Sequence, residues 1–227
     1  MRRLIIGLSG ASGAIYGIRA LEALKDVPDI ETHLVLSPSA KRTIVEETDW
    51  KVSAVEALAD VVHTHSDIGA AVASGSFITA GMIVAPCSIK TLSDIANSHN
   101  DNLLARAADV CLKERRRLVL LVRETPLHLG HIELMAQASR YGAVLLPPVP
   151  AFYNRPQTLD DIVNHTVGKA FDQFEIPHTL LKRWKEPPAA TNAPQRAAAK
   201  RPQLLTGDSR RVTSSPSDER KLAQDHP

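Results

Sequence analysis

Short apolar runs recur along the first 150 residues and are separated by segments of mixed polarity. Each run is rich in isoleucine, valine and leucine and lacks polar alternation. This pattern is typical of parallel strands in a sheet that helices cover on both faces. The runs that predict strands are Arg3–Leu8, Thr32–Leu36, Met82–Ala85, Leu118–Val122 and Ala143–Leu146.

Between these runs, apolar residues repeat at intervals of three and four, the spacing of an amphipathic helix. The segments with this spacing are Ala14–Leu24, Leu92–Ala96, Leu103–Arg115 and Ile132–Arg140. Strands that alternate with helices are joined by right-handed crossovers into a parallel sheet. The pattern therefore predicts an α/β fold, a doubly wound parallel sheet of Rossmann type.

The composition changes after Trp184. Residues 185–227 contain no aromatic side chain and are dominated by proline, alanine, serine and charges, so burial cannot offset the entropy lost on ordering. We therefore expect a single folded domain over residues 1–184 and a disordered tail over residues 185–227. The basic pairs Lys200-Arg201 and Arg210-Arg211 of the tail are expected to be solvated.

Charge and cysteine content narrow the classes of function. A formal net charge of +2 is too small to indicate a nucleic-acid or membrane-surface partner, and no run approaches the roughly 20 apolar residues of a membrane span. The apolar run at the start is interrupted by glycine too early for a signal peptide. Without an export signal, Cys87 and Cys111 are expected to be reduced thiols of a cytoplasmic protein that binds a small molecule.

The first predicted strand runs into the turn SGASGA before the first helix. Gly10, Ala11, Ser12 and Gly13 let the backbone approach an anion, and the helix start supplies N–H donors and a favourable dipole. The alternative is a tight turn without a ligand. The spacing is not G-x-G-x-x-G, and Ser37 follows the second strand where NAD-binding folds place an acid. The turn therefore favours the mononucleotide flavin FMN over NAD.

A second hydroxyl-rich turn follows the third predicted strand, at the kind of strand end where open α/β sheets bind ligands. The turn consists of Ser88, Ile89, Lys90 and Thr91. It either binds a phosphate or only caps the next helix through Ser88. The loop at residues 74–77, SGSF, is a candidate for lining the same crevice. We expect Cys87 to be a packed thiol, because no histidine is placed by sequence to activate it.

Charged residues provide candidate chemistry. Arg123 and Glu124 come directly after a buried strand and so point into the ligand crevice, where a carboxylic acid can act as a general acid or base. Arg106 and Lys113 are seven residues apart on one helical face, and Glu47 stands near a helix end. Taken alone, the last three residues also fit a solvated surface.

A tyrosine and a lysine near the end of the predicted domain complete the candidates. Tyr153 lies in a proline-flanked loop and Lys169 on the helix after it; together they are able to hold a phosphate, and packing and solvation are their alternative roles. His128 and His131 are interpreted as helix-start residues. No cluster of histidines and carboxylates has ligand spacing, so no metal is expected.

Seven segments occur in one order along the chain: GASGAIYG, ETD, SGSF, PCSIKTLS, RAADVCLKERR, RETPLH and PPVPAFYNRPQ. This series resembles the UbiX-like flavin prenyltransferases, from Met1 to about Trp184. The resemblance implies a flavoprotein fold and an enzyme that joins the dimethylallyl group of dimethylallyl phosphate to N5 and C6 of reduced FMN. The product, prenylated FMN, is implied to serve a separate UbiD-type decarboxylase in ubiquinone synthesis or aromatic acid degradation.

The resemblance also implies roles by position. The implied FMN-binding residues are Gly10, Ala11, Ser12, Gly13, Ser37, Ser88, Ile89, Lys90, Thr91 and Arg123. Those implied for the prenyl phosphate are Lys113, Tyr153 and Lys169, with Arg106 and Trp184 close by. Glu124 is implied as the main acid or base, with Glu47 and Lys113 as further catalytic residues. Position 169 is arginine in some relatives, which changes the donor geometry. A homo-oligomer, a dodecamer built from trimers with the flavin site at subunit contacts, is also implied.

Two other functions are open to a chain of this kind. A flavin-dependent decarboxylase of peptidyl cysteine or phosphopantothenoylcysteine shares the flavoprotein fold, but its active-site histidine and P-x-M-N-x-x-M-W segment are not recognisable here. A non-catalytic accessory subunit of a decarboxylase would bind flavin without chemistry. The presence of Glu47, Lys113, Glu124 and Tyr153 argues against that second alternative.

Overall fold

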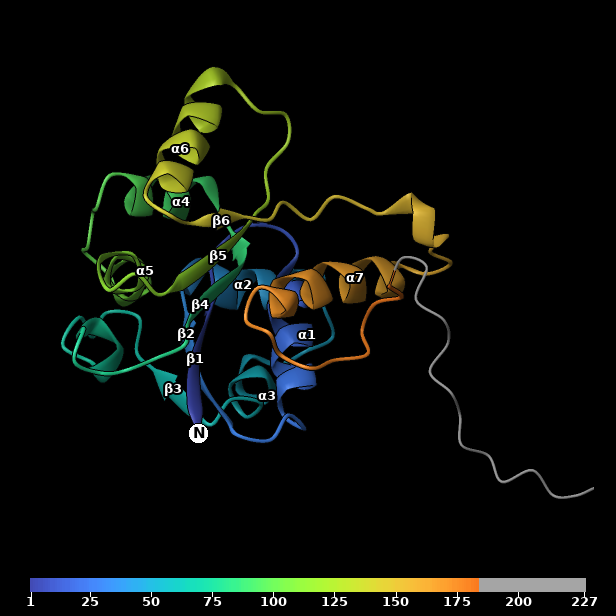
Figure 1. Cartoon of the computed structure of the whole chain (residues 1–227), viewed down its shortest axis with the longest axis horizontal. Coiled ribbons are helices and arrows are strands. Elements are labelled where there is room, and N and C mark those ends of the chain that lie inside the picture. Colours follow the sequence, from blue (N-terminus) through green and yellow to red (C-terminus); the bar gives the residue numbers. More distant parts are fainter. Residues whose placement is uncertain (184–227) are drawn as a thin grey trace, which may run out of the picture. The chain divides into compact units, whose positions relative to one another are not determined.

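Six parallel strands form one sheet in the order β3-β2-β1-β4-β5-β6 in the computed structural model, which describes residues 1–183 (Figure 1). Trp184 and the predicted tail, residues 185–227, lie outside the described residues. The strands are β1 (Arg2–Leu8), β2 (Ile30–Leu36), β3 (Val61–His63), β4 (Gly81–Cys87), β5 (Arg117–Val122) and β6 (Val144–Leu145). All five predicted strands are confirmed. The edge strand β3 was not predicted, because it has only three residues and polar neighbours.

The helices cover the sheet on both faces, as expected for the Rossmann-like fold. They are α1 (Ala14–Leu24), α2 (Pro38–Glu47), α3 (Val52–Glu56), α4 (Ile89–Ala96), α5 (Leu103–Lys113), α6 (Leu129–Arg140) and α7 (Leu159–Asp172), with the short 3-10 turns η1 (Ala71–Ala73) and η2 (Phe152–Asn154). The apolar spacing placed α1 correctly. It extended α5 two residues too far, to Arg115, which adopts a left-handed backbone with φ 58°.

The predicted starts of α4 and α6 were three residues too late, because capping residues rather than apolar spacing begin these helices. The Ser88 side chain accepts a hydrogen bond from the Thr91 N–H, so α4 begins at Ile89. The His128 side chain accepts one from the Gly130 N–H, so α6 begins at Leu129. His128 and His131 are therefore helix-start residues, as interpreted from the sequence.

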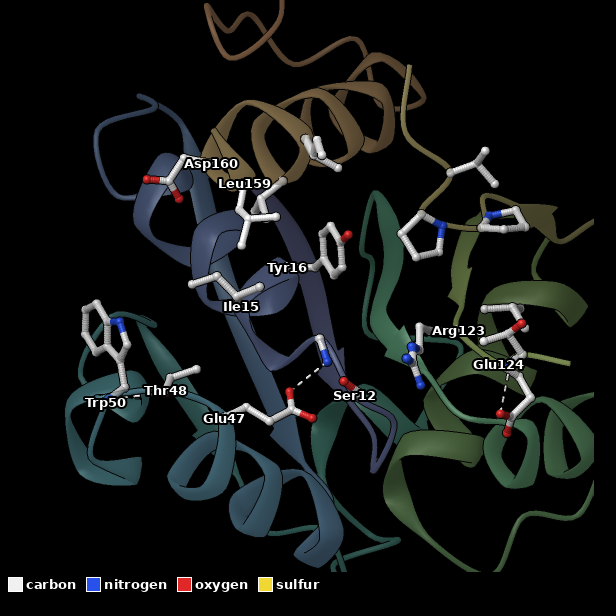
Figure 2. Close-up of a pocket in the computed structure, with 18 of the residues that line it drawn as sticks. Ser12, Ile15, Tyr16, Glu47, Thr48, Trp50, Arg123, Glu124, Leu159 and Asp160 are labelled. Carbon is white, nitrogen blue, oxygen red and sulfur yellow. Dashed lines mark hydrogen bonds between the residues drawn. The ribbon is translucent and has the colours of Figure 1, made fainter. Parts of the chain in front are cut away.

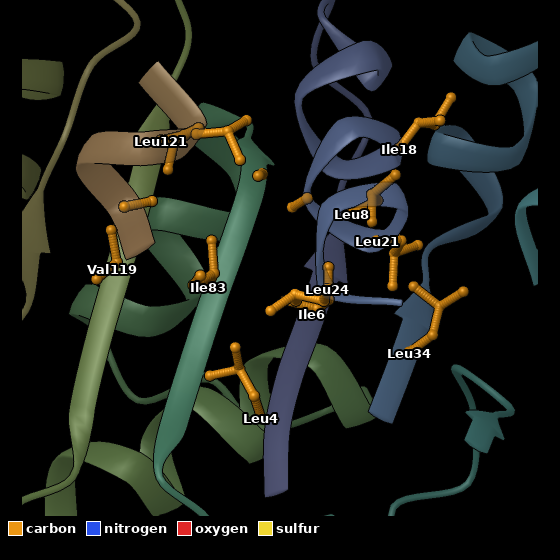
Figure 3. Packing of buried hydrophobic residues seen from close by; sticks show 14 of the residues in the cluster. Leu4, Ile6, Leu8, Ile18, Leu21, Leu24, Leu34, Ile83, Val119 and Leu121 are labelled. Carbon is orange, nitrogen blue, oxygen red and sulfur yellow. The ribbon is translucent and has the colours of Figure 1, made fainter. Parts of the chain in front are cut away.

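Two apolar layers bury the faces of the sheet. On one face Leu4, Ile6 and Leu8 of β1 pack with α1, α2, α3 and α7 (Figure 3). On the other face Ile5 of β1 packs with residues of α4, α5 and α6. Because successive side chains of a strand point to opposite faces, β1 must be apolar at almost every position. No helix within residues 1–183 is long and apolar enough to cross a membrane.

Candidate active site

A cavity of about 750 Å³ opens at the carboxyl ends of the strands (Figure 2). Its lining comes from the start of α1, the end of α2, the residues after β5, the residues after β6 and the start of α7. This is the edge at which doubly wound sheets bind their ligands. The predicted site residues that line it are Ser12, Gly13, Glu47, Arg123 and Glu124.

The turn before α1 is held in place by close packing and by a carboxylate. Gly13 adopts a left-handed backbone with φ 102°, which favours glycine. A Cβ atom on Gly10 would stand 2.2 Å from the Cβ atom of Ser39, so this turn packs directly on the start of α2. The backbone N–H groups of Gly13 and Ala14 donate to Oε2 of Glu47, at 2.7 and 3.3 Å. Two donors at the start of α1 are therefore already engaged by a side chain.

Arg123 and Glu124 leave β5 at the far side of the cavity from Glu47. The Arg123 N–H donates to the carbonyl of Cys87, which fixes the backbone where β5 ends beside β4. Figure 2 shows the Arg123 guanidinium in the space between Ser12 and Glu124. Oε1 of Glu124 accepts a hydrogen bond from the Thr125 N–H at 3.0 Å. One cation, Arg123, and four exposed carboxylates, those of Glu47, Asp49, Glu124 and Asp160, thus line one cavity.

Sequence reasoning missed Tyr16 and the apolar walls. Burial raises the pKa of the Tyr16 phenol, and the positive charge of Arg123 opposes that rise, so the two groups share one environment. The further apolar wall residues include Ile15, Trp50, Leu159 and Val163. These residues are far apart in the sequence or lie on different helical turns, and only the tertiary fold brings them together. Such walls suit a flat aromatic ring or an isoprenoid chain.

Ser37 and the turn at residues 88–91 follow β2 and β4, the two strands that flank β1. Ser37 follows β2 and caps α2, where its side chain accepts from the Ala40 N–H at 3.0 Å. Ser88 follows β4 and caps α4, accepting from the Thr91 N–H at 3.2 Å. Buried Ser9, at the end of β1, was not predicted as a site residue. Its hydroxyl accepts from the Ser88 N–H at 2.8 Å and donates to the Pro86 carbonyl at 3.0 Å, which ties the end of β1 to the turn at residues 88–91. β1 lies between β2 and β4 in the sheet.

The remaining residues of these turns have clear local roles. Ile89 is the first residue of α4. Lys90 donates to Asp94 at 2.6 Å, and this hydrogen bond raises the pKa of the Lys90 ammonium. Ser88 caps α4, as the N-cap interpretation predicted. Ser37 and the turn at residues 88–91 do not line the 750 Å³ cavity.

Arg106 and Lys113 do not reach this cavity within one chain. Arg106 donates to Asp109 at 3.1 Å and to the carbonyl of Ala73 at 3.3 Å. Lys113 ends α5 shortly before β5 begins, so it lies toward the amino-terminal edge of the sheet, where it pairs with Glu114 beside Gly75. The loop at residues 74–77 lies next to Lys113 and does not line this cavity.

Tyr153 and Lys169 come together elsewhere, around the side chain of His165. The centroids of the Tyr153 and His165 rings are 6.0 Å apart, and the ring planes form an angle of 84°. Lys169 follows His165 by one turn of α7. Nζ of Lys169 lies 3.5 Å from Asp172. Both Tyr153 and Lys169 are exposed. Next to this contact lies a smaller cavity of about 300 Å³, which Asn154 and His165 line together with other residues of the loop and of α7.

Both cysteines are packed in the core. Cys87 and Cys111 are free and buried. Burial, with the nearby Asp94 carboxylate, raises the pKa of the Cys87 thiol, and burial raises that of Cys111 to about 12. A thiol that stays protonated is a poor nucleophile, so the interpretation of Cys87 as a packed thiol is confirmed. Among residues 1–183, no three histidine, cysteine or acidic side chains are grouped so that they could hold a metal ion.

Comparison with known proteins agrees with this geometry. The flavoprotein family model matches residues 1–170. The flavin prenyltransferase UbiX of Escherichia coli (strain K12) is 62% identical over 187 residues, which cover 82% of this chain and 99% of that protein. The structure of AnUbiX (PadA1) in complex with FMN and dimethylallyl pyrophosphate is 48% identical with a TM-score of 0.79, and the match covers 82% of this chain and 98% of that one.

A third relative is a dodecameric FMN-dependent UbiX-like decarboxylase from Escherichia coli O157:H7. Its structure is 50% identical with a TM-score of 0.79 and matches 81% of this chain and all of that one. The fold, the site at the strand ends and the matched model define a flavoprotein. More narrowly, the chain belongs to the UbiX family of flavin prenyltransferases.

Proposed function

We propose that this protein transfers the dimethylallyl group of dimethylallyl phosphate to N5 and C6 of reduced FMN and releases prenylated FMN. The observation that carries the proposal is the cavity in which the Arg123 guanidinium and the carboxylates of Glu47 and Glu124 meet apolar walls. Its volume of about 750 Å³ lies in the range of small-molecule sites. The identity of 62% to a flavin prenyltransferase supports the same activity.

The arrangement of donors suggests how FMN is oriented. Because Glu47 already accepts from the N–H groups of Gly13 and Ala14, the flavin phosphate is assigned to the hydroxyl turns at Ser37 and at residues 88–91. Ser12, Gly13 and Arg123, which line the cavity, would then hold the isoalloxazine ring. Charge-assisted hydrogen bonds from Arg123 favour the electron-rich reduced ring.

Prenyl transfer requires a leaving group to be stabilised and protons to be moved. As the C1–O bond of the donor breaks, Tyr153, Lys169 and Lys113 stabilise the departing phosphate, which takes the bonding electrons. The new bond forms from N5 to C1, and the N5 proton leaves with the phosphate. Glu124 then protonates the prenyl double bond and takes the C6 proton as the bond to C6 closes. Glu124 ends in its starting state, and the apolar walls exclude water.

We propose that the site is completed by neighbouring copies in a homo-oligomer, a dodecamer built from trimers. Lys113, Tyr153 and Lys169 do not line the cavity of their own chain, and a relative with 50% identity is dodecameric. Mixing Glu124→Gln subunits with Tyr153→Phe subunits after dissociation should give more activity than either variant has alone. Mixed oligomers without activity would contradict a shared site.

The direct test of the function is anaerobic incubation of the protein with reduced FMN and dimethylallyl phosphate, followed by mass analysis of the extracted flavin. The expected result is a mass gain of one prenyl unit. Dimethylallyl pyrophosphate, the ligand of AnUbiX, is the second donor to compare. Unmodified FMN from folded, flavin-loaded protein would support the decarboxylase or accessory alternatives. A decarboxylase would release carbon dioxide from cysteine-containing substrates, whereas an accessory subunit would not.

The recipient of the product is proposed to be a UbiD-type decarboxylase in the cytoplasm. Adding this protein with its substrates to an apo form of such a decarboxylase should produce activity, whereas FMN alone should not. Whether the pathway is ubiquinone synthesis or aromatic acid degradation depends on the decarboxylase that responds.

A further inference from the structure

A side-chain hydrogen bond ties the η2 turn to α7. Nδ2 of Asn154 lies 2.9 Å from Nδ1 of His165. An amide nitrogen can only donate, so Nδ1 of His165 is the acceptor and the neutral ring carries its proton on Nε2. The bond joins a three-residue turn to a helix of fourteen residues whose opposite side packs in the core. The helix therefore provides a fixed support for the turn.

The same imidazole lies between the two residues proposed to bind the prenyl phosphate. Tyr153 immediately precedes Asn154, and the centroids of the Tyr153 and His165 rings are 6.0 Å apart in an edge-to-face arrangement. Lys169 is four residues after His165, which places both side chains on one face of α7. His165 thus contacts the residues of η2 on one side and neighbours Lys169 on the other.

The aromatic side chains of the η2 turn are exposed. Phe152 and Tyr153 are 75% and 57% exposed, and the turn has no side-chain cap. An exposed tyrosine on such a turn loses rotamer freedom when it binds, which weakens binding unless its backbone is already fixed. Burial and the nearby Lys169 ammonium lower the pKa of His165, against the effect of Asp172. The neutral, accepting form of the ring is therefore favoured.

We infer that Asn154 and His165 are positioning residues that hold the Tyr153 hydroxyl and the Lys169 ammonium at one phosphate site. The inference rests on the proposed prenyl transfer, in which Tyr153 and Lys169 bind the leaving phosphate. Asn154 and His165 act through Tyr153 and do not touch the reacting atoms. Their contribution is to the affinity for the prenyl donor and not to the affinity for FMN.

Variants of the full-length protein separate the hydrogen bond from the ring contact. His165→Phe keeps a ring beside Tyr153 but cannot accept from Asn154, whereas His165→Asn returns an oxygen near the place of Nδ1. Asn154→Ala removes the donor. Asn164→Ala is the matched control, because Asn164 is the preceding residue of α7 and accepts from Arg19 of α1 instead. Anaerobic prenylation rates give kcat and KM for dimethylallyl phosphate, and flavin fluorescence gives the dissociation constant of FMN.

His165→Phe and Asn154→Ala should each raise this KM about tenfold, the effect of losing roughly one hydrogen bond, with kcat and FMN affinity within about twofold. The double variant should show no further rise, His165→Asn should recover most of the loss, and Asn164→Ala should match the wild type. If Tyr153→Phe or Lys169→Ala raises this KM but His165→Phe leaves it unchanged, the positioning role is overturned and the proposed function is not. A wild-type protein that adds no prenyl unit to FMN overturns the proposed function itself.

Discussion

Glu124 is exposed and makes one local hydrogen bond, which a glutamine side chain at the same position can also make. Its Oε1 atom accepts from the Thr125 N–H, and the amide oxygen of glutamine can do the same. Glu124→Gln should therefore leave folding and FMN affinity unchanged. It should slow prenylation by about 10²-fold or more, the usual contribution of a general acid or base. Single-turnover mass analysis measures this rate, and a rate equal to that of the wild type would remove Glu124 from the mechanism.

Glu47 has a structural role that can be measured apart from its chemistry. Its carboxylate accepts from two N–H groups at the start of α1, where negative charge is stabilised by the helix dipole. Glu47→Ala should lower the free energy of unfolding by about 1 kcal/mol, as loss of an N-cap does, and Glu47→Gln should lower it less. Urea denaturation measures both.

The neighbouring Glu46 provides the control for this measurement. It pairs with Arg42 on the exposed side of α2, and surface pairs of this kind contribute only about 0.3–0.5 kcal/mol. If Glu46→Ala lowers the free energy of unfolding as much as Glu47→Ala does, the contact of Glu47 with the start of α1 does not stabilise the protein more than a surface ion pair.

Some of the site could be predicted from single residues and some could not. Arg123 and Glu124 were predicted because a polar pair directly after a buried parallel strand must face the ligand edge of the sheet. Tyr16 and Trp50 gave no such signal, since an aromatic residue near a helix has the same local pattern whether it packs in the core or lines a cavity. The contact of Glu47 with α1 joins residues more than thirty positions apart and has no local signature.

At the scale of helices and strands, apolar runs were the reliable signal. The strands that are buried on both faces, such as β1 and β4, were predicted within two residues. The edge strand β3 has only partly buried and exposed residues, so the run that would reveal it is missing. Helix starts depended on capping hydrogen bonds at Ser88 and His128, which the apolar spacing does not contain.

The closeness of α1 to the sheet depends on a single glycine. A Cβ atom on Gly17 would stand 2.3 Å from the carbonyl oxygen of Ala85 and 2.5 Å from Cγ of Leu8. Although alanine favours helix by up to about 1 kcal/mol, Gly17→Ala must push α1 away from β1 and β4. We expect a net loss of about 1–3 kcal/mol in the free energy of unfolding, as in other overpacked cores, together with weaker FMN binding.

Thermal and urea denaturation of Gly17→Ala, with FMN titration, test this expectation. Gly130→Ala in α6 is the matched control, because the atoms nearest to its Cβ belong to the exposed side chain of His128. That variant should be neutral or slightly more stable. Equal stability of Gly17→Ala and the wild type would mean that α1 adjusts without cost.

For the molecule as a whole, the proposed site has two parts, the strand-end cavity and the pair Tyr153 and Lys169, and this pair does not line the cavity of its own chain. Sequence reasoning placed Lys113 and Arg106 on one helical face, and α5 does carry both. The sequence does not show that Lys113, at the end of α5, lies at the opposite edge of the sheet from the cavity, because the direction in which a helix runs along the sheet depends on the topology. The proposed assembly with neighbouring copies follows from that separation.

Acid stability is also a property of the whole molecule, because partly buried histidines are distributed over it. Burial lowers the pKa of His63, His65 and His165, with further contributions from His33, Lys90 and Lys169 respectively. Their unfolded pKa is about 6.5, so below that pH the unfolded chain binds more protons than the folded one. The free energy of unfolding should therefore be constant near pH 7.5 and fall as the pH drops below about 6.5. Urea midpoints at fixed protein concentration measure this profile.

His63 allows the cause of this slope to be tested. In the neutral form of His33, Nε2 donates to Glu31 at 2.7 Å, so Nδ1 accepts from Nε2 of His63 at 3.0 Å. Glutamine at position 63 can keep that donor but cannot take up a proton. His63→Gln should therefore preserve stability at pH 7.5 and lessen its fall between pH 6.5 and 5, whereas the exposed control His99→Gln should follow the wild-type profile. An unchanged slope in His63→Gln would show that His63 is not a cause of the acid sensitivity.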